Sequence, residues 1–119
     1  MSARILIVED DEDFRTLAAK VLTKRGYDVT VAVTGSTGVE RALADATDLV
    51  LMDLRLPELD GWEATRRIKA TKPRLPIIAC SANVMQADLD RAEAAGCDAF
   101  LAKPYQVADL ITTVTRFVS

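Results

Sequence analysis

Four apolar runs of this 119-residue sequence each end in side chains that suit phosphoryl chemistry. The residues that follow runs 5–8, 49–52, 76–80 and 99–102 are Glu9, Asp10, Asp11, Asp53, Ser81 and Lys103. Each has an ordinary explanation by itself, as a helix cap, a loop residue or a solvated lysine. Gathered in one place, however, the carboxylates would repel each other, and a divalent cation would remove that cost.

A carboxylate, a metal ion, a hydroxyl and an ammonium together favour phosphoryl transfer. Mg²⁺ prefers oxygen ligands and typically takes one or two carboxylates plus phosphate oxygens. Lys103 can pair with a carboxylate at rest and with a phosphoryl oxygen later, while the Ser81 hydroxyl can donate to another phosphoryl oxygen. The pattern therefore predicts a site where an aspartate attacks phosphorus while positive charge stabilises the transferring group.

These side chains meet only if the elements that carry them form one parallel sheet. Apolar runs predict strands at 5–8, 28–32, 49–52, 76–80 and 99–102, each followed by a helical pattern. The first helix should end at Gly26, the second near Asp45 and the fourth at Gly96, with the third over about 62–70. Five units are too few for an eight-stranded barrel. The predicted fold is α/β and flavodoxin-like: a doubly wound five-stranded parallel sheet of order 2-1-3-4-5 in three α/β/α layers.

Composition indicates one domain over residues 1–119, because half of the residues are apolar and the length leaves no room for a second core. The net charge of −3 does not favour nucleic-acid binding. No run approaches the ~20 apolar residues of a membrane span, and no signal peptide is evident. Cys80 and Cys97 are expected to be buried free thiols, which fits a cytoplasmic location. The chain has no histidine, so any phosphohistidine must come from a partner.

Four segments resemble a known family over essentially the whole chain. They are ILIVEDD (5–11), LMDLRLPELDG (51–61), the pair Ser81-Ala82, and FLAKPY (100–105). In order and spacing they are similar to the receiver (CheY-like) domains of bacterial two-component response regulators, of the single-domain type. The resemblance implies that Asp53 is the phosphoacceptor. It also implies that Asp10 and Asp53 bind Mg²⁺ directly, that Glu9 binds it through water, and that the Arg55 backbone carbonyl completes the protein's ligands.

The resemblance also implies a conformational switch. Ser81 and Lys103 would bind the phosphoryl group, and the Phe100 ring would follow Ser81. The fourth helix, fifth strand and fifth helix would form the responsive face, with Ala102, Tyr105 and Gln106 turned toward a partner. The peptide bond before Pro104 is often cis in this family. Serine at 81 and phenylalanine at 100 replace the commoner threonine and tyrosine, while Arg55 and Asn83 stand at positions that tune the lifetime of the phosphorylated state.

The implied function is that of a phosphoacceptor response regulator in a phosphorelay. A histidine kinase or histidine phosphotransfer protein would supply the phosphoryl group, and a downstream target protein would read the changed face. The chain would catalyse only its own phosphorylation and dephosphorylation. Direct nucleic-acid binding and membrane insertion are not expected. The expected state is a monomer or a weak dimer through the responsive face.

Two other functions and two contexts stay open. A Mg²⁺-dependent aspartyl-phosphate hydrolase usually carries a second acid two residues after its nucleophile, where this chain has Arg55, and usually carries a cap domain. A phosphorylation-independent binding module would not need the acids, Ser81 and Lys103. A stand-alone regulator is the favoured context, although residues 54–67 look much like the receivers of hybrid kinases.

Overall fold

Five parallel strands form one sheet in the order β2-β1-β3-β4-β5 in the computed structural model, which describes residues 2–82 and 85–119. The strands are β1 (Arg4–Val8), β2 (Asp28–Ala32), β3 (Leu49–Asp53), β4 (Ile77–Ser81) and β5 (Ala99–Ala102). Every residue of β3 and β4 is buried, as the continuous apolar runs predicted for strands covered on both faces. The predicted strand order is confirmed.

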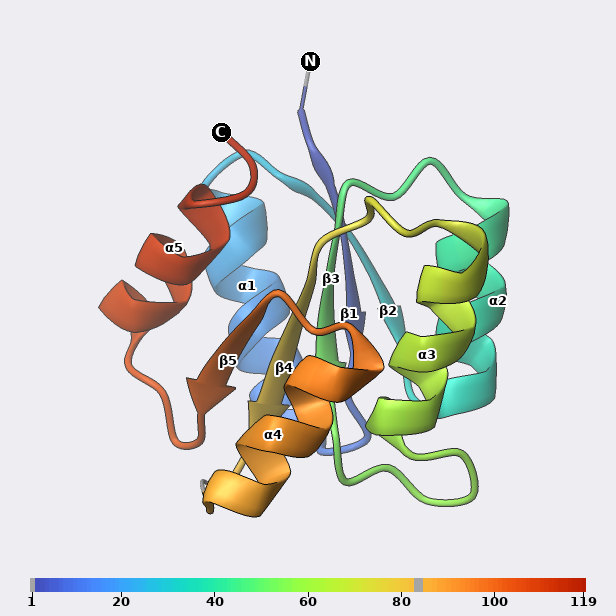
Figure 1. Cartoon of the computed structure of the whole chain (residues 1–119). Coiled ribbons are helices and arrows are strands. Elements are labelled where there is room, and N and C mark those ends of the chain that lie inside the picture. The colour runs from blue at the N-terminus through green and yellow to red at the C-terminus, as the bar shows by residue number, and fades with distance from the viewer. Residues whose placement is uncertain (1, 83–84) are drawn as a thin grey trace.

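Helices cover both faces of the sheet (Figure 1). On one face, α1 (Glu12–Lys24) and α5 (Val107–Thr115) bury Leu22 and Leu110 against β1, β3 and β4. On the other, α2 (Gly35–Ala44), α3 (Gly61–Thr71) and α4 (Gln86–Ala95) bury residues such as Ile68 against the sheet. These are the three predicted layers. Among the described residues, no helix combines the length and the apolar character that a membrane crossing needs.

Local signals explain where the helices begin and end. The side chains of Asp11, Thr34 and Asp60 accept hydrogen bonds from backbone N–H groups in the first turns of α1, α2 and α3. Gly26 follows α1 with φ 94° and Gly96 ends α4 with φ 107°, both in the left-handed region that glycine tolerates. The C-terminal ends of α1 and α4 therefore agree with the sequence predictions to within about two residues.

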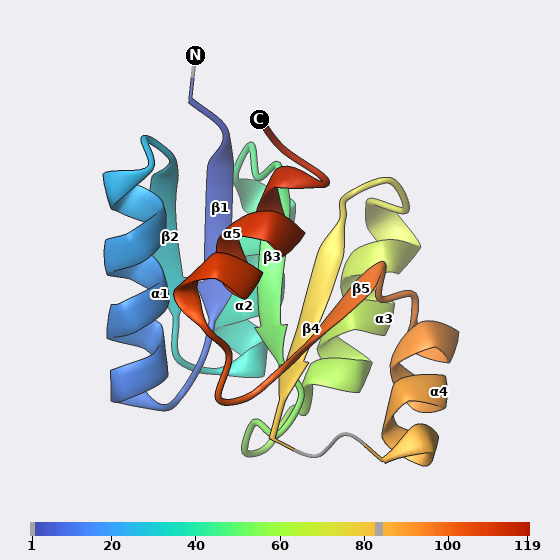
Figure 2. The same cartoon turned by 90° about the vertical axis from the view of Figure 1, so that its left-hand side faces the viewer.

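The carboxyl ends of the strands share one edge of the sheet, which is the lower edge in Figure 1. Figure 2 shows the β3–α3 loop and the start of α4 at the same edge. The register places Asp53 beside Cys80 and Ser81 beside Ala102, one step before Lys103. The Lys103–Pro104 peptide bond is cis, as the resemblance implied. This edge carries Glu9, Asp10, Asp53, Ser81 and Lys103, as expected for an open α/β sheet.

Candidate phosphoryl and metal site

Three carboxylates from two adjacent strands meet at this edge. Glu9 and Asp10 follow β1 and Asp53 ends β3, and one carboxylate oxygen from each lies within 4.8 Å of the others. Glu9 and Asp53 are 5% and 4% exposed, whereas Asp10 is open to solvent. The predicted convergence of acids from two strand ends is therefore present in the structure.

Lys103 lies against the two buried acids. Its Nζ is 2.5 Å from Glu9 Oε1 and 3.6 Å from Asp53 Oδ1, and its side chain is 9% exposed. Burial opposes its charge, but the bond to Glu9 and the charge of Asp53 outweigh burial and raise the pKa of Lys103. Nζ also lies 4.6 Å from the centre of the Phe14 ring. One permanently charged lysine thus faces three carboxylates.

Burial and the excess of negative charge raise the pKa values of two of the acids, Glu9 and Asp10. Burial, reinforced by Asp53 and only partly offset by Lys103, raises the pKa of Glu9 from 4.5 to about 7. Burial and the neighbouring Asp53 likewise raise the pKa of Asp10. The site therefore holds less positive charge than its three carboxylates need, and those carboxylates offer only oxygen ligands. A hard divalent cation such as Mg²⁺ fits this donor set.

The first testable prediction concerns stability and pH. Glu9 binds its proton more tightly in the folded protein than in the unfolded chain, so folding stability is greatest below pH ~4.5 for this group and falls as pH rises to about 7. Without metal, we expect this group to lower the free energy of unfolding by about 3 kcal/mol across that interval. The Lys103 pKa lies above this interval, so Lys103 stays charged throughout and does not contribute to the fall.

Urea unfolding in a chelating buffer between pH 5 and 8 measures this effect. Glu9→Gln should flatten the fall, whereas Glu40→Gln, which changes an exposed glutamate of α2, should leave it unchanged. A wild-type stability that rises between pH 5 and 7, or a fall that persists in Glu9→Gln, contradicts the prediction.

Backbone contacts hold the acids in place. The Asp11 N–H donates to Glu9 Oε2 at 3.2 Å, and the Arg55 N–H donates to Asp53 Oδ1 at 3.2 Å. The Arg15 guanidinium donates to the carbonyl oxygens of Glu9 and Asp10 at 3.1 and 3.3 Å. Sequence reasoning missed Arg15, because a side chain that bonds to backbone carbonyls leaves no pattern of residue types.

Asp11 differs from the other acids of its run. Its carboxylate caps α1 by accepting from the Phe14 N–H at 3.1 Å, and it lies outside the group of three acids. The chain turns into the helix directly after Asp10, which points the next side chain at the helix terminus. The site thus uses two of the three consecutive acids.

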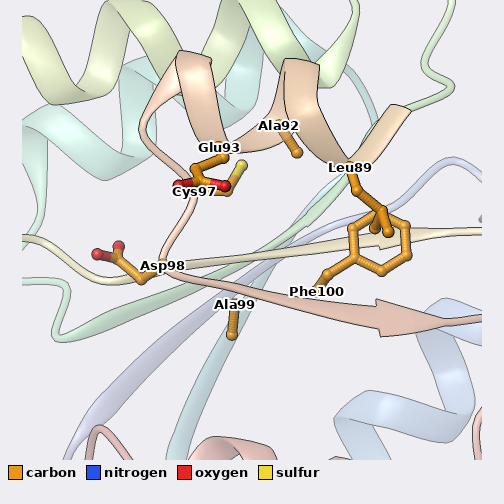
Figure 3. A pocket seen from close by; sticks show the side chains of 7 residues that line it. All are labelled: Leu89, Ala92, Glu93, Cys97, Asp98, Ala99 and Phe100. Carbon is orange, nitrogen blue, oxygen red and sulfur yellow. The ribbon is translucent and has the colours of Figure 1, made fainter. Parts of the chain in front are cut away.

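Ser81 lies on β4, the strand next to β3, and Phe100 lies on β5, the strand beyond it. Ser81 ends β4 and is 1% exposed. Phe100 pairs with Ala79, and since residues two apart on a strand share a face, Phe100 and Ser81 belong to the α4 side of the sheet. Figure 3 shows the Phe100 ring beside Leu89 of α4, in a cavity of about 450 Å³ between α4 and β5.

The three residues expected to face a partner differ in their exposure to solvent. Ala102 and Gln106 are exposed, but Tyr105 is half-buried and its ring lies 5.8 Å from that of Phe14. The tyrosine therefore packs against α1 instead of facing solvent entirely. Asn83 lies outside the described residues. Cys80 and Cys97 are both free, as predicted, but only Cys80 is fully buried, whereas Cys97 is half-buried. Burial raises the pKa of each thiol.

The fold and site define a class of protein that comparison with known families confirms. The family model described as the response regulator receiver domain matches residues 5–115, and the chain belongs to this family. Receiver domains are signalling switches of two-component systems and not enzymes in the usual sense.

Individual relatives of two kinds match the chain. It is 32% identical to the polar-differentiation response regulator DivK of Brucella abortus, over 99% of this chain and 98% of that protein. It is 39% identical to hybrid signal transduction histidine kinase G of Dictyostelium discoideum, over 96% of this chain but only 4% of that protein. The family thus supplies similar domains both alone and within long kinases.

Solved structures agree with the fold. The receiver domain of sensor histidine kinase PA1611 from Pseudomonas aeruginosa is 39% identical, with a TM-score of 0.91 and 98% of both chains covered. Its structure has a magnesium ion coordinated in the active-site cleft. The chemotaxis protein CheY4 of Vibrio cholerae is 22% identical with a TM-score of 0.94, covers 99% of this chain and 100% of its own, and supports the fold alone.

Proposed function

We propose that this chain is a phosphoacceptor response regulator whose receiver domain spans residues 1–119 and takes a phosphoryl group onto Asp53. The observation that supports this most is the meeting of three carboxylates within 4.8 Å of one another beside Lys103. Asp53 is the buried member of this group that ends β3, lies 3.6 Å from Lys103 Nζ and receives the Arg55 N–H. A buried aspartate in that position suits a nucleophile.

The proposal includes a set of metal ligands, which the grouping of three acids supports. Asp10 and Asp53 would bind Mg²⁺ directly, Glu9 through water, and the Arg55 backbone carbonyl would complete the protein's share. A magnesium ion held there would offset the excess negative charge and stabilise the charge on the transferring phosphoryl group. The all-oxygen donor set, the raised pKa values of Glu9 and Asp10 and the magnesium-bound relative support this assignment.

The reaction moves one phosphoryl group between two proteins. A carboxylate oxygen of Asp53 attacks the phosphorus of a phosphohistidine on a histidine kinase or phosphotransfer protein. The new O–P bond forms an acyl phosphate as the P–N bond breaks and the electron pair returns to the imidazole. Lys103 pairs with a phosphoryl oxygen and the Ser81 hydroxyl donates to another. Water later hydrolyses the acyl phosphate and restores the Asp53 carboxylate.

The signal is a shift between two conformations. The conformation in which Ser81 moves toward the phosphoryl group, with Phe100 following, binds the modified aspartate better, so phosphorylation raises its population. The cavity beside Phe100 gives that ring room to move. The α4–β5–α5 face then presents a changed surface to a downstream target protein.

The same proposal covers context. The chain acts through proteins and not by contacting nucleic acid or inserting into a membrane, as a monomer or a weak dimer through the α4–β5–α5 face. Its free thiols suit a cytoplasmic location. The DivK relative favours a stand-alone regulator, and the hybrid-kinase relative supports a receiver within a longer protein.

Chemical mapping of the phosphoryl group tests the proposal. After incubation with Mg²⁺ and a small acyl phosphate, borohydride reduction of the labelled carboxyl followed by peptide mass spectrometry should identify Asp53 alone. A chelator should abolish the modification. Modification at another residue would move the acceptor, and turnover of phosphomonoesters through many cycles would instead support a hydrolase.

A further inference from the structure

Trp62, in the first turn of α3, contacts two arginine side chains. The Arg55 Cζ is 4.9 Å and the Arg91 Cζ 4.0 Å from the centre of its ring, which is 2% exposed. Arg55 belongs to the β3–α3 loop that follows Asp53, and Arg91 belongs to α4. Cation–π contacts with one ring thus join the loop, α3 and α4.

Two acids cross-link the same elements. Asp88 of α4 accepts from the loop residue Arg55 at 3.0 Å, and Asp60, which precedes α3, lies 3.8 Å from Arg91 of α4. The Asp88 side chain is only 16% exposed, whereas both arginines are about half exposed. We call these five residues the Trp62 clamp: Arg55, Asp60, Trp62, Asp88 and Arg91. Among the described residues the indole Nε1 has no hydrogen-bond partner, so apolar packing and the two cation–π contacts hold the ring.

The clamp is connected to the phosphoryl site through one peptide. The backbone N–H of Arg55 donates to Asp53 Oδ1, while the guanidinium of the same residue contacts Asp88 and Trp62. Phosphorylation would convert the Asp53 carboxylate to an acyl phosphate and remove its charge from the remaining oxygen. A neutral carbonyl is a weaker acceptor than a carboxylate, so the resting position of Arg55 loses support.

We propose that the Trp62 clamp is a resting-state restraint and that Asp88 is a positioning residue for the phosphoryl site; this inference rests on the proposed function. Asp88 holds Arg55 where its N–H stabilises the unmodified Asp53 carboxylate, and it holds α4 against the loop. Any contact that favours the unmodified state lowers the affinity of the site for a phosphoryl group by the same factor. Releasing the clamp therefore strengthens binding of that group.

Beryllofluoride, a stable mimic of an aspartyl phosphoryl group, tests this in the presence of Mg²⁺. Trp62 is the sole tryptophan, so its emission reports the clamp directly during the titration. We expect Asp88→Asn to bind beryllofluoride about threefold to tenfold more tightly than wild type, the scale of one exposed ion pair with its cation–π contact. Asp88→Glu, which restores the charge, should return affinity toward the wild-type value.

Asp90→Asn is the matched control. It removes the same charge from the same helix, but Asp90 bonds to Gln86 and lies outside the clamp. Its affinity should stay within about twofold of wild type. Circular dichroism and urea unfolding of each variant establish that all are folded.

The outcomes separate the two hypotheses. If wild type responds to beryllofluoride but Asp88→Asn binds no more tightly than Asp90→Asn, the restraint is disproved and the proposed function stands. If wild type responds no more than Asp53→Asn does, the proposed function fails and the restraint fails with it.

Discussion

Lys103→Gln is expected to slow phosphorylation of Asp53 by a small acyl phosphate about 100-fold, the scale of losing one preorganised charged donor. Lys103 is the described cation closest to the buried acids, with Nζ 3.6 Å from Asp53 Oδ1. An incoming phosphoryl group brings more negative charge into a site that already holds three carboxylates. Glutamine keeps much of the side-chain length but supplies no charge to offset that repulsion.

The same substitution should have the opposite effect on metal affinity. Lys103 Nζ lies 2.5 Å from Glu9 Oε1, so its charge repels any cation brought to the neighbouring oxygens. Removing the lysine charge makes the net charge of the site more negative. We therefore expect Mg²⁺ to bind about tenfold more tightly. Tighter binding of metal together with slower phosphoryl transfer distinguishes loss of a phosphoryl-binding charge from general damage to the site.

Two measurements check the pair of effects. Magnesium titration followed by Trp62 emission gives the affinity, and quantitative mass spectrometry of the modified protein gives the rate. Asp53→Asn sets the background for the rate, and Lys20→Gln, which changes an exposed lysine of α1, controls for net charge. Phosphorylation of Lys103→Gln at more than a third of the wild-type rate would remove Lys103 from the proposed role.

Gly61→Ala is expected to destabilise the fold by about 3 kcal/mol or more, at the upper end of overpacking effects. A Cβ atom at Gly61 would lie 2.2 Å from the carbonyl oxygen of Asp53 and 2.6 Å from Leu54 Cα. Both are backbone atoms next to the last residue of β3, so no side-chain rotation relieves the clash. The first residue of α3 must move away, and the end of β3 must move with it.

Because the clash falls on Asp53 itself, the variant should also lose Mg²⁺ affinity while it remains folded at low temperature. Urea unfolding measures the stability and magnesium titration the affinity. Gly26→Ala is a matched control: a Cβ there meets nothing within 4 Å, and only its φ of 94° is strained. We expect that control to lose about 1–2 kcal/mol and to keep normal metal affinity. Equal losses in both variants would contradict the packing argument.

The sequence by itself determined the framework of this protein. Strands covered on both faces must be apolar throughout, so runs such as 49–52 and 76–80 identified β3 and β4 without ambiguity. Alternation of strands and helices then required a parallel sheet, whose carboxyl ends share an edge. The meeting of Glu9, Asp10 and Asp53 follows from that rule alone.

Only the tertiary structure decided which partner each polar side chain takes. It placed Lys103 closer to Glu9 than to Asp53, directed Asp11 to the helix terminus, and used Arg15 to hold backbone carbonyls. The Trp62 clamp was equally hidden, since Arg55 and Arg91 are 36 positions apart and exposed charged residues follow no period. Burial imposes a repeating pattern that can be found in a sequence, whereas a hydrogen bond or an ion pair depends on distances that only the packed elements set.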